Sequence, residues 1–192
     1  YPRHKDVVLA VTATPPRRGV PREYEVIEVP LNKKPTLTVI ENVRTTLRDF
    51  DVAQWDALVE YLYRQHGGLT VAAPSRVLQQ TALCSQQSAQ LVECIEVWGR
   101  RSHGVTIQSP AIIIGEPWLS YIAYQTAFGG DPMLATELTL IQTVQTLARV
   151  RPWTRRTFSY SVGPIALRYE DYFSRLFEVE TAIWDGQQIR KQ

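Results

Sequence analysis

Residues 51–73 read DVAQWDALVEYLYRQHGGLTVAA, a helix signal followed at once by a strand signal. Asp51 is a strong helix N-cap, and a glutamine three residues later nearly completes a capping box. Apolar residues then recur at intervals of three and four, which marks one buried helix face; they are Trp55, Leu58, Val59 and Leu62. His66 and Gly67 end the helix, and residues 69–73 form a short apolar strand. This junction predicts a mixed α/β domain.

Further elements are predicted on both sides of this junction. A second helix is expected from Ser85 to about residue 102, because four apolar residues fall on one stripe; they are Leu91, Val92, Ile95 and Trp98. Other strand-like runs lie at residues 36–40, 43–48, 105–107 and 111–114. The order strand, helix, strand over 69–107 favours one right-handed crossover with parallel pairing.

The C-terminal half continues the alternation. Helices are predicted at residues 117–128, from Asp131 to Pro152, and at 171–184, with a β-hairpin at 157–169 and a polar tail at 185–192. The expected fold is therefore mixed α/β (α+β). It has a small mixed sheet with one parallel crossover, about five helices, and a C-terminal hairpin plus helix. Residues 36–192 would form one globular domain.

Residues 1–35 differ from the rest in composition. They hold half of the chain's 12 prolines and a run of basic residues that includes Arg17, Arg18 and Arg22. Proline at this density disfavours helices, so we expect an extended arm with strand-like pieces at 7–11 and 24–29. The arm would wrap its own domain or lie along a neighbouring chain, in which case those three arginines contact the partner.

The chain has two cysteines, Cys84 and Cys94. On one helix they would lie about 15 Å apart, which excludes a mutual disulfide. A reducing or intracellular environment is then favoured, and Cys84, near a helix N-terminus, is a candidate nucleophile for a cysteine-dependent enzyme.

The composition and motifs exclude several functional classes. With 44% apolar and 21% charged residues the chain is ordinarily globular, and a net charge of +2 is too small for a polycation that coats nucleic acid. No apolar run approaches the roughly 20 residues of a membrane span. Glycine-rich phosphate-binding loops and the usual metal-ligand spacings are lacking, so we predict no cofactor, no metal and no catalytic constellation.

One segment combines basic and aromatic residues: Arg149, Arg151, Trp153, Arg155, Arg156, Phe158 and Tyr160. This mixture suits a protein–protein hot spot, or phosphate contact with base stacking. Alternatively, the arginines end a helix and the aromatic side chains fill the face of a hairpin. Arg151, Trp153, Arg155 and Arg156 are the partner-binding candidates, with protein the main partner and nucleic acid the lesser one.

The element order over residues 36–119 resembles the STAS domain family of small α/β regulatory modules. That family has an Asp-Ser or Asp-Thr pair before its second helix, where this chain has Leu83-Cys84-Ser85. The resemblance implies an adaptor acting through switchable protein contacts. The main expectation is a non-enzymatic structural or accessory subunit of a larger assembly, such as a virion, a phage particle or an organelle complex. It would bind other subunits or copies of itself.

Overall fold

The computed structural model describes residues 33–45, 50–85, 92–97, 106–115, 129–163 and 165–192. One seven-stranded sheet dominates these residues, with strand order β3-β2-β4-β5-β1-β6-β7. Its strands are β1 (Thr36–Ile40), β2 (Leu69–Ala73), β3 (Val92–Glu96), β4 (Ala111–Ile114), β5 (Phe158–Val162), β6 (Glu178–Trp184) and β7 (Ile189–Lys191). All neighbouring strands pair in parallel except β6 and β7, which form an antiparallel hairpin.

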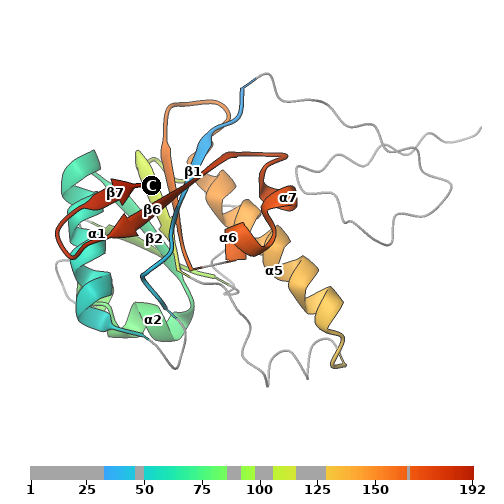
Figure 1. The fold of residues 1–192 in the computed structure, drawn as a ribbon. Helices are drawn as coiled ribbons and strands as arrows, with labels where there is room; N and C mark the ends of the chain where they lie inside the picture. The colour runs from blue at the N-terminus through green and yellow to red at the C-terminus, as the bar shows by residue number, and fades with distance from the viewer. Residues whose placement is uncertain (1–32, 46–49, 86–91, 98–105, 116–128, 164) are drawn as a thin grey trace, which may run out of the picture.

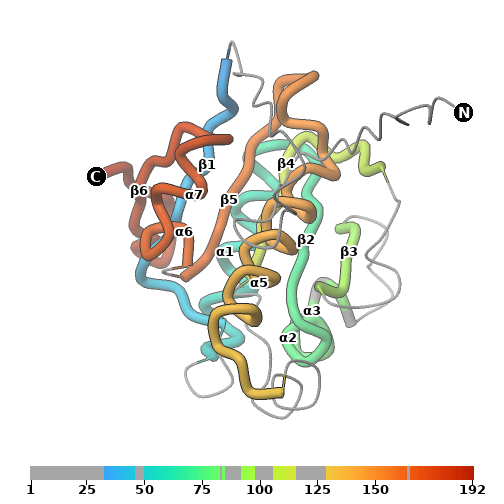
Figure 2. Tube along the Cα trace, turned by 90° about the vertical axis from the view of Figure 1, so that its right-hand side faces the viewer, coloured from blue at the N-terminus to red at the C-terminus, as the bar shows by residue number. Residues whose placement is uncertain are grey.

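Helices cover both faces of this sheet (Figure 1). On one side lie α1 (Val52–His66) and α2 (Ser75–Gln80), followed by the short α3 (Ala82–Ser85). On the other lie α5 (Pro132–Leu147), α6 (Ile165–Arg168) and α7 (Glu170–Phe173). Figure 2 looks onto α5, which crosses in front of the central strands. A sheet covered on both faces needs strands that are apolar throughout, and β2 and β4 are buried at every position.

The core consists of two apolar layers separated by the sheet. Along β4, Ala111 and Ile113 belong to the α1 layer, whereas Ile112 and Ile114 belong to the α5 layer. This alternation follows from the period of two in a strand. The connections from β1 to β2 and from β2 to β3 lead toward the β3 end of the sheet, whereas the later connections lead toward the β7 end. Right-handed crossovers therefore place the helices on opposite faces.

Several predicted elements are confirmed. The α/β class is as expected, and α1 begins after Asp51, whose carboxylate accepts a hydrogen bond from the Gln54 backbone N–H. Gly67 ends α1 with a φ of 70°. The strands at 36–40, 69–73 and 111–114 and the helix after Asp131 also form as expected.

The hairpin predicted at 157–169 is wrong in its second half. β5 forms, but residues 165–168 make the helical turn α6. Ile165 and Ala166 are consecutive and both fully buried. The alternation of apolar residues at 165–169 covers too few positions to distinguish a strand from a turn of helix. The hairpin of this region is formed by β6 and β7 instead.

The last predicted helix, at 171–184, is also wrong. Only Glu170–Phe173 is helical, and residues 178–184 form β6, which pairs with β1 along five positions. Residues 178–184 include three β-branched residues, which favour strands, and the neighbouring strand β1 provides a pairing partner. Residues 189–191 add β7 in place of a wholly polar tail.

The helix predicted from Ser85 to 102 is contradicted by β3, which pairs in parallel with β2. Val92 and Ile95 are three residues apart, the spacing of a helix face, and both are buried. They lie in different core layers, because an odd separation along a strand places side chains on opposite faces. The element order behind the STAS resemblance therefore does not hold here.

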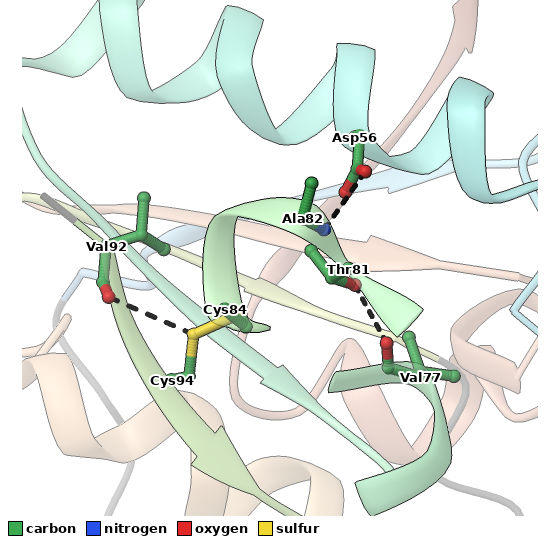
Figure 3. The surroundings of a disulfide bond; sticks show 7 residues. All are labelled: Asp56, Val77, Thr81, Ala82, Cys84, Val92 and Cys94. Atoms are coloured by element: carbon green, nitrogen blue, oxygen red, sulfur yellow. Dashed lines mark hydrogen bonds between the residues drawn. A yellow bond between two sulfur atoms is a disulfide. The ribbon is translucent and has the colours of Figure 1, made fainter. Parts of the chain in front are cut away.

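Cys84 and Cys94 form a disulfide, which corrects the expectation that one helix would hold them apart (Figure 3). Their Cα atoms lie 6.1 Å from one another, because α3 packs beside β3. The preference for a reducing environment relied on that separation and loses this support. Residues 1–32 of the predicted arm (1–35) and the predicted helix at 117–128 lie outside the described residues, as do Arg17, Arg18 and Arg22.

Candidate functional site

The Arg–aromatic segment lies at the amino edge of the sheet, where β4 and β5 begin side by side. Ala111 and Phe158 are paired at this edge, and the Phe158 backbone N–H donates to the Pro110 carbonyl at 2.9 Å. The chain before β4 runs against the chain before β5, since Ile107 N–H donates to the Arg149 carbonyl at 3.1 Å. Residues 149–160 hold four arginines and no acidic residue, so this segment of the edge is basic.

Arg155 fixes the two chain segments to each other. Its Nε donates to the Val150 carbonyl at 2.7 Å, and its Nη1 donates to Gln108 Oε1 at 3.0 Å. Its Nη2 also donates to the Ile107 carbonyl. The five donors of a guanidinium suit this kind of multiple capture of carbonyl groups. Arg155 therefore has a structural role within its own domain.

Trp153 and Arg151 also contact their own domain. The indole Nε1 of Trp153 donates to the Leu176 carbonyl at 3.2 Å, and its ring lies 5.2 Å from that of Phe177. Arg151 adopts a left-handed backbone with a φ of 54°, and its Nη2 donates to Thr106 Oγ1 at 3.3 Å. The Arg151 side chain is nevertheless exposed.

Arg156 points outward and meets an aromatic group. Its guanidinium carbon lies over the Phe158 ring, 6.0 Å from the ring centroid, which is the outer limit of a cation–π contact. Phe158 is 39% exposed, an unusual state for a large apolar side chain. On the α1 side, the His66 ring stacks on Phe158 with centroids 4.3 Å apart and an angle of 27°.

His66 is held in place by Tyr160. Its Nε2 lies 2.8 Å from the Tyr160 hydroxyl, and the two rings are tilted with centroids 5.7 Å apart. Burial lowers the pKa of His66 and, with nearby Tyr61 and Glu180, raises the pKa of Tyr160 to about 12. The imidazole is therefore neutral and the phenol protonated at neutral pH. We call His66, Arg156, Phe158 and Tyr160 the amino-edge cluster.

The cluster shows what the sequence did and did not reveal. Of the predicted partner-binding residues within the described part, only Arg156 belongs to it, while Arg151, Trp153 and Arg155 bind their own domain. His66 was interpreted as a helix-end residue and was missed as a member. It lies 94 residues from Tyr160, and no local sequence pattern connects the two.

Arg149 is half-buried, like Arg155. Burial lowers its pKa, and among the described residues its Nε has no hydrogen-bond partner. It lies in the 3-10 turn η2 (Ala148–Val150), directly after α5. Its positive charge therefore lies on the face of the sheet that α5 covers, near the amino edge.

The opposite, carboxyl edge has a different character. Here the connections from β2 and β4 leave in opposite directions, which in open α/β sheets is where ligands commonly bind. Gly115 closes this edge tightly, since a Cβ at this position would lie 3.1 Å from Thr45 Oγ1 and 3.3 Å from Ala73 Cβ. The described residues therefore leave no room for a side chain at position 115.

Metal ligands, free thiols and membrane-spanning helices are other features that could define a function. Within the described ranges, no group of three His, Cys, Asp or Glu residues is placed to hold a metal ion. Cys84 is disulfide-bonded and so carries no thiol for a nucleophilic role in this state. No helix in the described part of the chain is long and apolar enough to cross a membrane.

Comparison with known proteins gives a likeness of fold. No protein-family profile matches the chain, and no curated protein matches it. Among solved structures, the chain is similar to one titled XPD_Helicase, with a TM-score of 0.55 and 13% sequence identity. The match covers 76% of this chain and 35% of that chain, so this chain spans about a third of the helicase's length. At this identity, the likeness shows a shared fold.

Proposed function

We propose that this chain is a helicase-type motor domain that acts on nucleic acid. The observation that carries the proposal is the fold likeness to a helicase chain over 76% of these residues. The Arg–aromatic segment adds support, because four arginines and no acidic residue within residues 149–160 suit the phosphates of a nucleotide or of a strand.

The proposal requires a second domain for the nucleotide. A helicase separates strands at the expense of a nucleoside triphosphate, and the 192 residues contain no glycine-rich phosphate-binding loop. The triphosphate-binding loop must then come from another domain, in the same protein or in a partner. This chain would supply arginines that neutralise charge on the phosphates as they react.

Strand separation tests this function directly. The protein is isolated from its source through an affinity tag, with the domains that accompany it, and mixed with a partial duplex carrying a labelled strand. We expect the labelled strand to be released with ATP and magnesium but not with a non-hydrolysable analogue. The 192-residue chain alone should hydrolyse no ATP. A protein that melts cooperatively but releases no strand under any of these conditions contradicts the proposal.

A structural or accessory role in a larger assembly is the second candidate. Its supporting observation is the start of α5, where Met133 is 53% and Leu134 is 42% exposed, since adjacent exposed apolar side chains suit a protein contact. Light scattering tests it: a native mass well above 21.9 kDa should fall when residues 1–34 are removed or when Leu134 is changed to Ser. A monomer that remains a monomer in its source extract contradicts this role.

A further inference from the structure

We infer that the amino-edge cluster binds a nucleotide unit, with the base stacked on Phe158 and the phosphate held by Arg156. The inference deepens the proposed function and rests on it for the natural ligand, while the side chains supply the geometry. The cluster lies where β5 begins, beside the end of α1.

The stacking surface is rigid before any ligand arrives. Phe158 stacks on His66, and the hydrogen bond between His66 Nε2 and the Tyr160 hydroxyl fixes the imidazole ring. β5 is paired on both sides, so the Phe158 backbone cannot shift independently. A prearranged aromatic ring loses little conformational entropy on binding, and base–aromatic stacking contributes about 1–3 kcal/mol per base.

The charge of the surroundings suits a phosphate. Arg156 is exposed, and within the described residues its guanidinium contacts only the Phe158 ring. On α1, Glu60 is paired with Arg64, and on β6, Glu180 is paired with Lys191, whereas Glu178, the first residue of β6, is exposed. The phosphate therefore meets an arginine that is free to turn toward it, and two of the surrounding carboxylates, Glu60 and Glu180, are already paired.

The nucleotide unit can come from two sources, a free nucleotide or a single strand. AMP and an oligo-dA of about twelve nucleotides, within the usual site sizes, present the same base and distinguish them. Binding is measured by calorimetry for AMP and by fluorescence anisotropy for the labelled oligonucleotide. The NMR signals of the His66 ring report whether the base stacks at this site. Binding of either probe with a shift of the His66 signals supports the inference.

Substitutions test the individual contacts. Phe158→Ala should weaken binding by about 5- to 150-fold, whereas Phe158→Tyr, which keeps a ring, should restore it. Arg156→Gln should reduce the slope of log K against log salt by about 0.7 for the oligonucleotide. Arg168→Gln, the same charge change at an exposed position of α6, should leave binding unchanged, as should Met133→Ala.

Three results would overturn the inference. They are no binding of either probe at millimolar concentration, unchanged affinity in a cooperatively melting Phe158→Ala variant, and equal losses in Arg156→Gln and Arg168→Gln. Failure of this inference and failure of the proposed function give different results. Phe158-dependent AMP binding without ATP-driven strand release contradicts only the motor role. Intact strand release with unchanged affinity in Phe158→Ala contradicts only the cluster.

Discussion

Asn42 binds the backbone of Trp184 through both ends of its side-chain amide. Its Oδ1 accepts from the Trp184 N–H at 2.9 Å, and its Nδ2 donates to the Trp184 carbonyl. The parallel pairing of β1 with β6 ends at Ala182, so the Asn42 side chain continues it beyond the end of β1. This contact joins residues 142 positions apart and secures the strand that the sequence had predicted as a helix.

Asn42→Ala should therefore destabilise the β1–β6 junction. Two backbone groups of Trp184 lose their partner, and we expect the free energy of unfolding to fall by about 1–2 kcal/mol. Denaturation in urea measures this loss. Gln187→Ala, at the neighbouring exposed turn, is the control and should change stability little. Equal losses in both variants would show that the Asn42 contact contributes nothing specific.

Trp55→Ala should be the most damaging single change in α1. The side chain is fully buried beneath the helix, so its removal leaves a large cavity and should cost about 3–5 kcal/mol. Trp55→Phe should cost less, because it keeps most of the volume and removes an indole N–H that has no partner among the described residues. Thermal melting compares the two, and a loss below about 1 kcal/mol in the alanine variant would contradict the packing.

Reduction of the Cys84–Cys94 disulfide should weaken the fold. The bond closes a loop of sequence separation 10 between α3 and the edge strand β3, for which loop entropy predicts about 2–3 kcal/mol. Adding a thiol reductant should lower the urea midpoint of the natural chain. The variant with both cysteines changed to serine should start at that lower midpoint and not respond to reductant. A response in the double variant would rule out the disulfide as the cause.

Acid should destabilise the domain through His66. Burial lowers the folded-state pKa of His66, so the folded protein disfavours its protonated form. The contribution is fully present above the unfolded pKa of about 6.5 and is lost as the pH falls through the lower folded value. Urea denaturation from pH 8 to pH 5 should show this decline, and His66→Gln should flatten it. The same decline in the variant would assign it to another group.

Asp56 should change the stability with pH in the opposite direction to His66. Burial raises the pKa of Asp56, against the opposing hydrogen bond from the Ala82 N–H shown in Figure 3. Its contribution is therefore present at low pH and is lost as the pH rises through its raised folded value. This sign is opposite to that of His66. Asp56→Asn keeps the side chain uncharged, so it should remove this loss at rising pH in urea denaturation and leave the decline due to His66 in place.

The sequence by itself determined the local structure wherever the helix caps and the spacing of apolar residues indicate the same element. Asp51, the apolar stripe of α1 and Gly67 fixed that helix, and the uniformly apolar runs at 69–73 and 111–114 fixed two central strands. These signals act between neighbours in the chain, so they are legible without knowledge of the fold.

Tertiary structure decided the elements whose partners are distant. Residues 178–184 became a strand because β1 offered a pairing edge, and Val92 and Ile95 reached separate core layers because β3 joined β2. The same holds for the candidate site: Arg156 and Phe158 were visible in the sequence, but His66 joined them only through folding. Contacts between residues about a hundred positions apart depend on strand order, and strand order is a property of the whole sheet.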